Sequence, residues 1–469
     1  MKTNKLTLAA LAGVPLVMVL GNSLLIPVLP SIQNALNLTA VEVSLVITLF
    51  SIPAGLVIPL AGFLSDRYGR KIVIIPSLIL YALGGVVAGL AAIFLKESAF
   101  YLILGGRVLQ GIGAAGTAPI AMALCGDLWQ GTERAKSLGI IEAANGMGKV
   151  ISPVLGAAIG LIFWYAAFIF FPLVIIPVVL AMWFFVKEPE KQKEPPGLKS
   201  YLNSIKNIFK EKAPLLLSCF LAGASALSLI FGVLFFLSDY LERSLHLTGI
   251  IKGLALAVPV LFMSTTSYIT GALIKKQVVL MKTLVVSGLV LIAISLAVLS
   301  FFDNIYIFYV SISMAGVGTG LVLPCLNMLI TSATSSEERG MVTSLYNGVR
   351  FIGVALGPPA FGLLMGYGRP VMFWAAAGLA GVSAGISFFF IKIRAIKSSS
   401  QKEEQGEKEK DSEKRHKPST EACEISGGGM LVYLSPKGDT TIIAQQPAKK
   451  PLDNYLEGQE VKNGEGNNQ

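Results

Sequence analysis

Apolar residues form twelve long segments along this chain, separated by short polar stretches. Each segment has about 20 residues or more, so at 1.5 Å per residue it can cross a hydrocarbon core about 30 Å thick. The segments lack the two-residue alternation of a barrel strand, and a helix satisfies its own backbone in lipid. The pattern therefore predicts helical spans over residues 7–29, 41–63, 72–95, 100–125, 137–163, 165–186, 214–238, 250–274, 280–302, 304–332, 341–366 and 370–393.

The composition excludes a soluble globular protein. Apolar residues make up 54% of the 469 residues and charged residues only 14%, whereas soluble domains carry about 25% charged residues. Three of the four cysteines, Cys125, Cys219 and Cys325, lie inside apolar segments, which is typical of small buried residues and not of a metal site. No nucleotide-binding loop of the G-x-x-x-x-G-K-[ST] type is present. We expect no enzyme activity, no cofactor and no metal.

The net charge of +10 reflects membrane topology. Lys and Arg gather at one set of loops and helix ends, which includes both termini, while the other set holds Lys96, Arg243, Lys252 and Arg369. The positive-inside rule then predicts that both termini are cytoplasmic. Nucleic-acid binding is not needed to explain the charge, and the predicted surroundings are the lipid bilayer.

The spans divide into two copies of one six-helix unit. A polar linker with several prolines, residues 187–213, separates residues 1–186 from residues 214–393. Glu133-Arg134 recurs as Glu338-Arg339, and other Gly and Pro positions recur at the same offset. Parallel repeats of this kind are a transporter architecture with the substrate bound between the halves. We therefore predict an all-α integral membrane protein of twelve helices in two parallel pseudo-repeats.

The composition changes after the last span. Residues 394–469 are polar and rich in mixed charges, so we expect a cytoplasmic and largely disordered tail. Within it, residues 430–434 and 440–444 have the pattern of a short β-hairpin around Pro436-Lys437-Gly438.

The loop between the second and third spans reads Gly62-Phe-Leu-Ser-Asp-Arg-Tyr-Gly-Arg-Lys71. It resembles the G-x-x-x-D-R-x-G-R-K signature of the major facilitator superfamily. The resemblance implies a loop that latches the two halves, with Asp66 against the eleventh helix and Arg67 near Asp127. The alternative is that the cations only keep the loop inside. The latch candidates are Gly62, Asp66, Arg67, Gly69, Arg70, Lys71 and Asp127.

Three further motifs resemble those of the twelve-span drug:proton antiporters of that superfamily. Residues 106–114 are similar to the R-x-x-Q-G-x-G motif of proton-driven members, and Pro27-Val-Leu-Pro30 is similar to their P-x-x-P. The fifth span resembles the antiporter packing motif, although Ser152 replaces a glycine, and the eleventh span repeats it. Its residues are Gly148, Ser152, Pro153, Gly156, Gly353, Gly357 and Pro358. The resemblance implies a bacterial multidrug exporter that works as a monomer in the inner membrane.

Polar residues inside the spans mark the candidate transport site. Glu142, Asn145 and Lys149 share one face of the fifth span. The two copies of the repeat are offset by 205 residues, so Asn347 and Arg350 of the eleventh span are equivalent to Glu142 and Asn145. We predict that both stripes face a common cavity. Glu142 is the leading proton-coupling candidate and Arg107 the second, although a structural charge network explains them equally well. Further cavity candidates are Asn22, Gln110 and Tyr346.

These patterns leave three functions open. The first is a proton-coupled secondary transporter that exports amphipathic or cationic drugs by alternating access. The second is a transporter of the same fold for a specific solute, a sugar or a lipid-linked glycan, and the excess of Arg107, Lys149 and Arg350 over Glu142 suits an anionic group. The third is a non-transporting sensor with a signalling tail.

Overall fold

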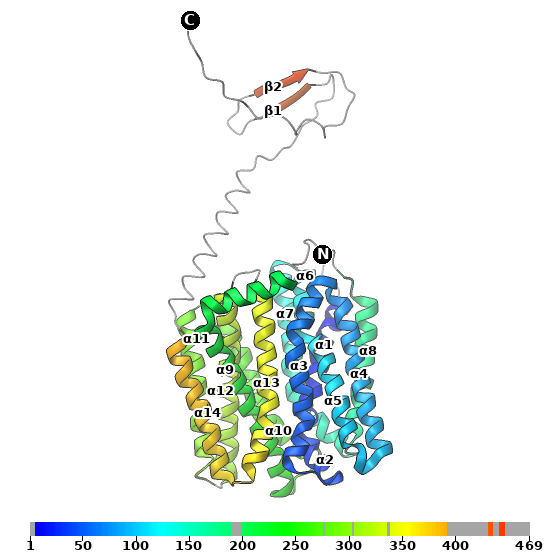
Figure 1. The fold of residues 1–469 in the computed structure, drawn as a ribbon, viewed down its shortest axis with the longest axis vertical. Helices are drawn as coiled ribbons and strands as arrows, with labels where there is room; N and C mark the ends of the chain where they lie inside the picture. The colour runs from blue at the N-terminus through cyan, green and yellow to red at the C-terminus, as the bar shows by residue number, and fades with distance from the viewer. Residues whose placement is uncertain are drawn as a thin grey trace. The chain divides into compact units, whose positions relative to one another are not determined.

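The computed structural model describes residues 5–188, 198–274, 277–302, 304–334, 338–391, 430–434 and 440–445. Up to Ile391 these residues form a bundle of helices (Figure 1). Both the all-α fold and the predicted succession of spans are confirmed for this part of the chain.

The first six spans contain two interrupted helices. The first span breaks at the 3₁₀ turn η1, and the fourth breaks between α5 and α6. The helices are α1 (Lys5–Ser23), η1 (Ile26–Val28), α2 (Leu29–Ala35), α3 (Ala40–Tyr68), α4 (Arg70–Leu95), η2 (Lys96–Ala99), α5 (Phe100–Ala115), α6 (Ala118–Leu128), α7 (Gly131–Gly160) and α8 (Ala166–Phe185).

The last six spans are single helices. They are α9 (Leu198–Arg243), α10 (Gly249–Leu273), α11 (Val278–Val298), α12 (Ile305–Ala333), α13 (Arg339–Met365) and α14 (Arg369–Phe390). Within the described residues, eleven helical spans are long and apolar enough to cross a bilayer. The remaining predicted span is α7, which has the length at 30 residues but carries the polar stripe of Glu142, Asn145 and Lys149.

The predicted linker, residues 187–213, is partly helical. Helix α9 begins at Leu198 and continues past Lys212, where the backbone leaves helical geometry at φ −124° and ψ 17°. The kink lies two residues before Pro214, which lacks the N–H that would bond to the Lys210 carbonyl. Ile208 is buried and the Lys212 ammonium donates to the Ala333 carbonyl at 2.6 Å, so this segment packs on the second half.

The two halves repeat one packing pattern. In the first half, α3 and α4 pack on α5, α1 packs on α7, and α8 packs on α4 and α1. In the second half, α10 and α11 pack on α12, α9 packs on α13, and α14 packs on α11 and α9. Each pair has its counterpart six spans later, as parallel pseudo-repeats require.

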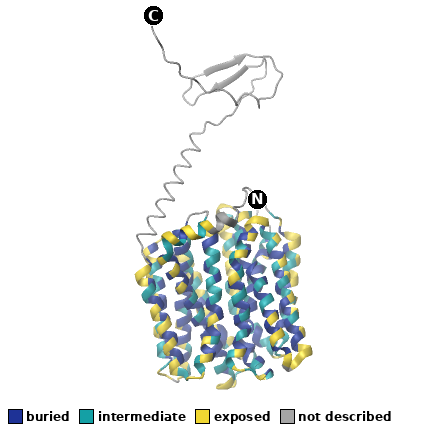
Figure 2. Ribbon diagram, in the orientation of Figure 1, coloured by how far each residue is buried: buried dark blue, intermediate teal, exposed yellow. Residues whose placement is uncertain are grey.

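The halves meet along two helix pairs, α3 with α13 and α7 with α10. At the first pair, a Cβ added to Gly55 would lie 2.7 Å from the Gly348 carbonyl oxygen, so the backbones touch directly. Buried residues lie where helices meet (Figure 2). Large apolar side chains such as Phe94 and Phe184 are exposed. In a bilayer these side chains face lipid.

Strands β1 (Met430–Leu434) and β2 (Thr440–Gln445) pair antiparallel, with an irregularity between Leu431 and Val432. The predicted hairpin is confirmed and is one residue longer than expected. The remainder of the predicted tail, residues 394–429, 435–439 and 446–469, lies outside the described residues.

Candidate functional site

We call the membrane side that holds the α3–α4 turn and the start of α9 the linker end, and the side that holds η1 and the α9–α10 turn the opposite end. At the linker end, Gly69 joins α3 to α4 with φ at +121°, a conformation that L side chains rarely adopt. A Cβ there would lie 3.1 Å from the Glu188 carboxylate. The positive φ therefore requires glycine at this position of the loop motif, and the Glu188 carboxylate leaves little room for a side chain.

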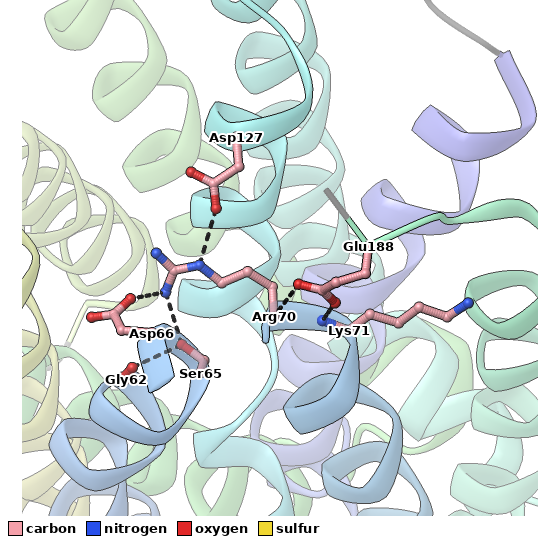
Figure 3. Close-up of polar contacts among 7 residues, drawn as sticks. All are labelled: Gly62, Ser65, Asp66, Arg70, Lys71, Asp127 and Glu188. Carbon is pink, nitrogen blue, oxygen red and sulfur yellow. Dashed lines mark hydrogen bonds and ion pairs between the residues drawn. The ribbon is translucent and has the colours of Figure 1, made fainter. Parts of the chain in front are cut away.

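Arg70 is the centre of the linker-end cluster (Figure 3). Its guanidinium forms an ion pair with Asp66, a second ion pair with Asp127 at 3.1 Å, and donates to the Ser65 hydroxyl at 2.8 Å. The resemblance implied Arg67 as the partner of Asp127, and the structure pairs Arg70 with this carboxylate. Arg70 is the first residue of α4, beyond the Gly69 turn, and from there it reaches both α3 and α6.

Glu188, which is distant in the sequence, also contacts the linker-end cluster. Its carboxylate accepts hydrogen bonds from the backbone N–H groups of Arg70 at 2.7 Å and Lys71 at 2.6 Å. A carboxylate at these free N–H groups caps α4 and complements the helix dipole. The Lys71 ammonium donates to the Trp183 carbonyl at 2.8 Å. No local motif reveals Glu188, because it lies 118 residues after Arg70 in the sequence.

Gly62 of the loop motif touches the second half. A Cβ at Gly62 would lie 2.9 Å from the Ser344 hydroxyl of α13. The ion pairs of Arg70, in contrast, join elements of the first half. The motif thus combines a close contact between the halves with a charge cluster inside one of them.

A second charge cluster occupies the opposite end. The Lys252 ammonium of α10 lies 2.6 Å from the Glu242 carboxylate of α9 and donates to the Pro27 carbonyl of η1 at 2.7 Å. Asp239 pairs with Arg243 one turn apart at 2.7 Å. From the sequence, Lys252 counts only among the cations that set the membrane topology. Its position inside the predicted span 250–274 already indicated a buried charge that needs a partner.

The polar stripes of α7 and α13 lie between these two ends. Lys149 of α7 is within electrostatic range of both Glu142 and Arg350, and Arg350 belongs to α13 of the second half. Arg350 donates to the Asn347 side-chain oxygen at 3.3 Å, and its guanidinium lies 5.4 Å from the Tyr346 ring centre. Glu142 is exposed, whereas Asn145 and Lys149 are half-buried.

Two polar atoms of these stripes have no hydrogen-bond partner within the described residues. They are the Oδ1 atom of Asn145 and the Nε atom of Arg350, and both are buried. Buried polar atoms are normally hydrogen-bonded, so a bound molecule or water would supply the missing partners of this acceptor on α7 and this donor on α13.

Arg107 stands apart from the stripes. It is fully buried, donates to the Val46 carbonyl at 2.8 Å and to Gln110 at 2.7 Å, and lies 4.3 Å from the Phe50 ring centre. It makes no ion pair with any carboxylate in the part of the chain that the structure describes. Its contacts tie α5 to α3 inside the first half.

The other two cavity candidates also bridge helices. Asn22 is buried and donates to the Ser51 hydroxyl of α3 at 3.3 Å. Tyr346 is buried against α9, where its ring centre lies 5.8 Å from that of Phe220.

Neither the five described segments of the bundle nor the hairpin contains a group of His, Cys, Asp and Glu residues that could hold a metal ion.

The family model of the Major Facilitator Superfamily matches residues 11–358 and, in a second alignment, residues 281–436. The chain belongs to the major facilitator superfamily. It is therefore a multi-pass membrane transporter, and the fold and the loop motif are those of this superfamily.

Two bacterial relatives are similar over most of their length. The chain is 43% identical to the "Bacillibactin exporter" of Bacillus subtilis (strain 168) over 387 residues, which cover 82% of this chain and 96% of that protein. It is 28% identical to "Multidrug efflux protein YfmO" of the same organism over 74% of this chain and 83% of that one.

Solved structures agree on the fold of the superfamily. The chain resembles the human organic anion transporter MFSD10 (TETRAN), with a TM-score of 0.65 at 19% identity, over 82% of this chain and all of that one. It also resembles a bacterial homolog of the human lysosomal transporter Spinster, with a TM-score of 0.67 at 18% identity, over 84% and 97% of the two chains.

The predicted packing residues are placed equivalently in the two halves of this superfamily member. Gly148 lies against Leu16 and Gly156 against Leu24, both of the first span, which brings α7 close to it. In the second half, Gly353 and Gly357 lie against Ala224 and Ser228 of α9. Ser152 is buried at the position where the motif has glycine. Pro153 and Pro358 lie inside the long helices α7 and α13.

Proposed function

We propose that this chain is a secondary exporter that carries a small anionic molecule across the membrane by alternating access of its two six-helix halves. The observation that carries the proposal is the pair of polar stripes on α7 and α13, one in each half. One cation comes from each half, Lys149 from α7 and Arg350 from α13, and Glu142 is the one carboxylate of the stripes. An anionic group between the two cations would hold the halves together and would satisfy the free Nε atom of Arg350.

The relatives suggest which molecules to test first. Bacillibactin is the first substrate to test, because the protein named for its export is 43% identical over almost its whole length. Drug export is the second candidate, supported by the 28% identity with a multidrug efflux protein. Among drugs, the two cations of the stripes favour anionic or neutral compounds over the cationic ones that the motifs alone suggested.

Glu142 is the proposed proton carrier. Its side chain is exposed and lies near Lys149, so a proton on Glu142 would change the charge next to the proposed anion site. With the linker end in the cytoplasm, as Lys and Arg predict, proton entry supplies about 2.3 kcal/mol per 100 mV of membrane potential. That supply is enough to drive export of a dilute solute.

The test measures transport in proteoliposomes with an imposed pH gradient. We expect gradient-driven movement of bacillibactin, and little movement of a cationic dye. Lys149→Gln and Arg350→Gln should each reduce the rate about ten-fold or more, as expected for the loss of one charged contact. Lys206→Gln, which neutralises an exposed cation of the linker helix, is the matched control and should retain the wild-type rate.

Glu142→Gln tests the coupling separately. We expect it to abolish uphill transport and to retain downhill exchange, because glutamine cannot release a proton. Full gradient-driven transport by folded Glu142→Gln protein would exclude Glu142 as the carrier. If bacillibactin, anionic drugs and cationic dyes all fail to move, the sensor hypothesis takes the place of the transport proposal.

A further inference from the structure

Two side chains of the second half donate hydrogen bonds to the backbone of the first half at the opposite end. The Ser238 hydroxyl of α9 donates to the Ile26 carbonyl at 2.8 Å, and the Lys252 ammonium of α10 donates to the Pro27 carbonyl at 2.7 Å. Both acceptors belong to the short turn η1. Both hydrogen bonds therefore meet the first half at one short turn.

The sequence of η1 explains why its carbonyls can accept these bonds. Helix α1 ends at Ser23, and α2 begins only at Leu29. Pro30 stands four residues after Ile26 and has no N–H, so the Ile26 carbonyl accepts a 3₁₀ hydrogen bond from the Leu29 N–H in place of an α-helical one and keeps a lone pair for Ser238. The P-x-x-P segment thus interrupts the first span next to Ser238 and Lys252, the two donors of the second half.

Lys252 brings a buried charge to this contact. Its side chain is only 2% exposed, and its ammonium is 2.6 Å from the Glu242 carboxylate. Burying a cation is costly unless a counter-charge accompanies it. Glu242 belongs to the same half as Lys252, so it can stay with the ammonium when the halves separate, while the bond to Pro27 cannot.

The surroundings of Lys252 lie at the seam of the two halves. Lys252, Glu242 and Gly249 line a small pocket together with Pro27 and Ser31 of the first span and Gly160 of α7. Next to it, a Cβ on Gly253 would lie 2.8 Å from the Ala157 side chain. Opening this end would expose Ala157, which is now 6% exposed.

We propose that Lys252 is the gate residue of the opposite end. Its bond to the Pro27 carbonyl holds this side closed, and Glu242 positions the ammonium and keeps it charged. In the open state the ammonium stays with Glu242 and the bond to η1 is broken. The inference rests on alternating access but on no particular substrate or coupling ion.

The test measures opening directly with one introduced thiol. In a protein whose four cysteines are replaced by alanine, Ala157→Cys is labelled by a membrane-impermeant thiol reagent added from either side without substrate. Lys252→Met should raise the labelling rate from the opposite end about five-fold or more, the factor that about 1 kcal/mol produces in a two-state equilibrium. Because no substrate is used, failure of the proposed export function leaves this readout unaffected.

Arg243→Met is the matched control. It also removes an ion pair at the opposite end, but that pair joins Arg243 to Asp239 within α9. Its labelling rate should stay within about two-fold of the parent, as for other exposed pairs. An equal rise in both variants would show general loosening and would overturn the proposal.

Two further variants separate the gate from a mere structural ion pair. Lys252→Arg retains a charged donor and should keep labelling low. The exchanged pair Lys252→Glu with Glu242→Lys restores the charges but removes the donor from position 252, so its labelling should stay high. Low labelling in the exchanged pair, or in folded Lys252→Met protein, would falsify the gate. If Lys252→Met does not fold, Ser238→Ala removes the neighbouring bond to η1 and must raise labelling by itself.

Discussion

The two ends of the bundle use charge in different ways. At the linker end, the ion pairs of Arg70 join α3, α4 and α6 of the first half, and the guanidinium is 22% exposed. At the opposite end, the ammonium of Lys252 is almost fully buried and reaches from the second half to the first. A charge cluster within one half stabilises that half in every state of the cycle, while a bond across the halves stabilises only the state in which it forms. The comparison separates a scaffold from a gate.

The largest effect is expected from Arg70→Met. It removes two ion pairs and the bond to Ser65, and it leaves Asp66 and Asp127 without their shared cation. We expect at least about a ten-fold loss of transport and a lower thermal midpoint, because each charged hydrogen bond contributes about 1.5–3 kcal/mol. Thiol labelling in the Ala157→Cys background should change little. A large rise in labelling with unchanged thermal stability would show that this cluster is also a gate.

Asp66→Asn should impair transport next most strongly, with Asp127→Asn weaker. Both carboxylates are nearly half exposed, so solvent screens part of each ion pair. Asp66 also lies one helical turn from Gly62, the point of contact with α13. Initial transport rates at matched expression measure the effect. Wild-type transport rates in Asp66→Asn would support the alternative that the charges of the loop only keep it on the cytoplasmic side.

Glu242→Gln tests how much the counter-charge of Lys252 contributes to closure of the opposite end. Glutamine keeps an oxygen acceptor for Lys252 but removes the counter-charge, and Asp239 remains within electrostatic range of the ammonium. In the Ala157→Cys background we expect labelling to rise about two-fold, less than with Lys252→Met, since one carboxylate remains nearby. A rise equal to that of Lys252→Met would mean that the charge pair alone holds this end closed.

Glu188→Ala should have a smaller effect. It removes the carboxylate cap from the first turn of α4, and loss of a helix cap costs about 1 kcal/mol. We expect a small drop in the thermal midpoint of the purified protein with transport largely retained. Glu211→Ala, in the linker helix, provides a substitution of the same type away from the cap.

Deletion of the tail after Lys397 should have the smallest effect. All twelve spans and both charge clusters precede the cut. The transport rate, and the labelling rate of the Ala157→Cys variant, should both match those of the full chain. Loss of transport in a correctly inserted truncation would assign a function to residues 398–469.

The sequence by itself determined the architecture. Span length and the offset that relates the halves are properties of short segments, and the structure follows them in order. The hairpin of residues 430–445 was also predictable, because its two apolar stretches flank a turn. The linker was only half right, since a polar stretch with Ile205 and Ile208 at helical spacing can continue a helix as well as separate two.

Tertiary structure alone decided which charges meet. Arg70 binds Asp127, Glu188 reaches Arg70 across 118 residues, and Lys252 reaches Pro27 across 225. Each contact depends on how far a helix is rotated about its axis and how closely its neighbours approach. Side-chain packing among many helices sets that rotation, and hydrophobic periodicity leaves it open because lipid-facing and buried positions in a membrane span are equally apolar.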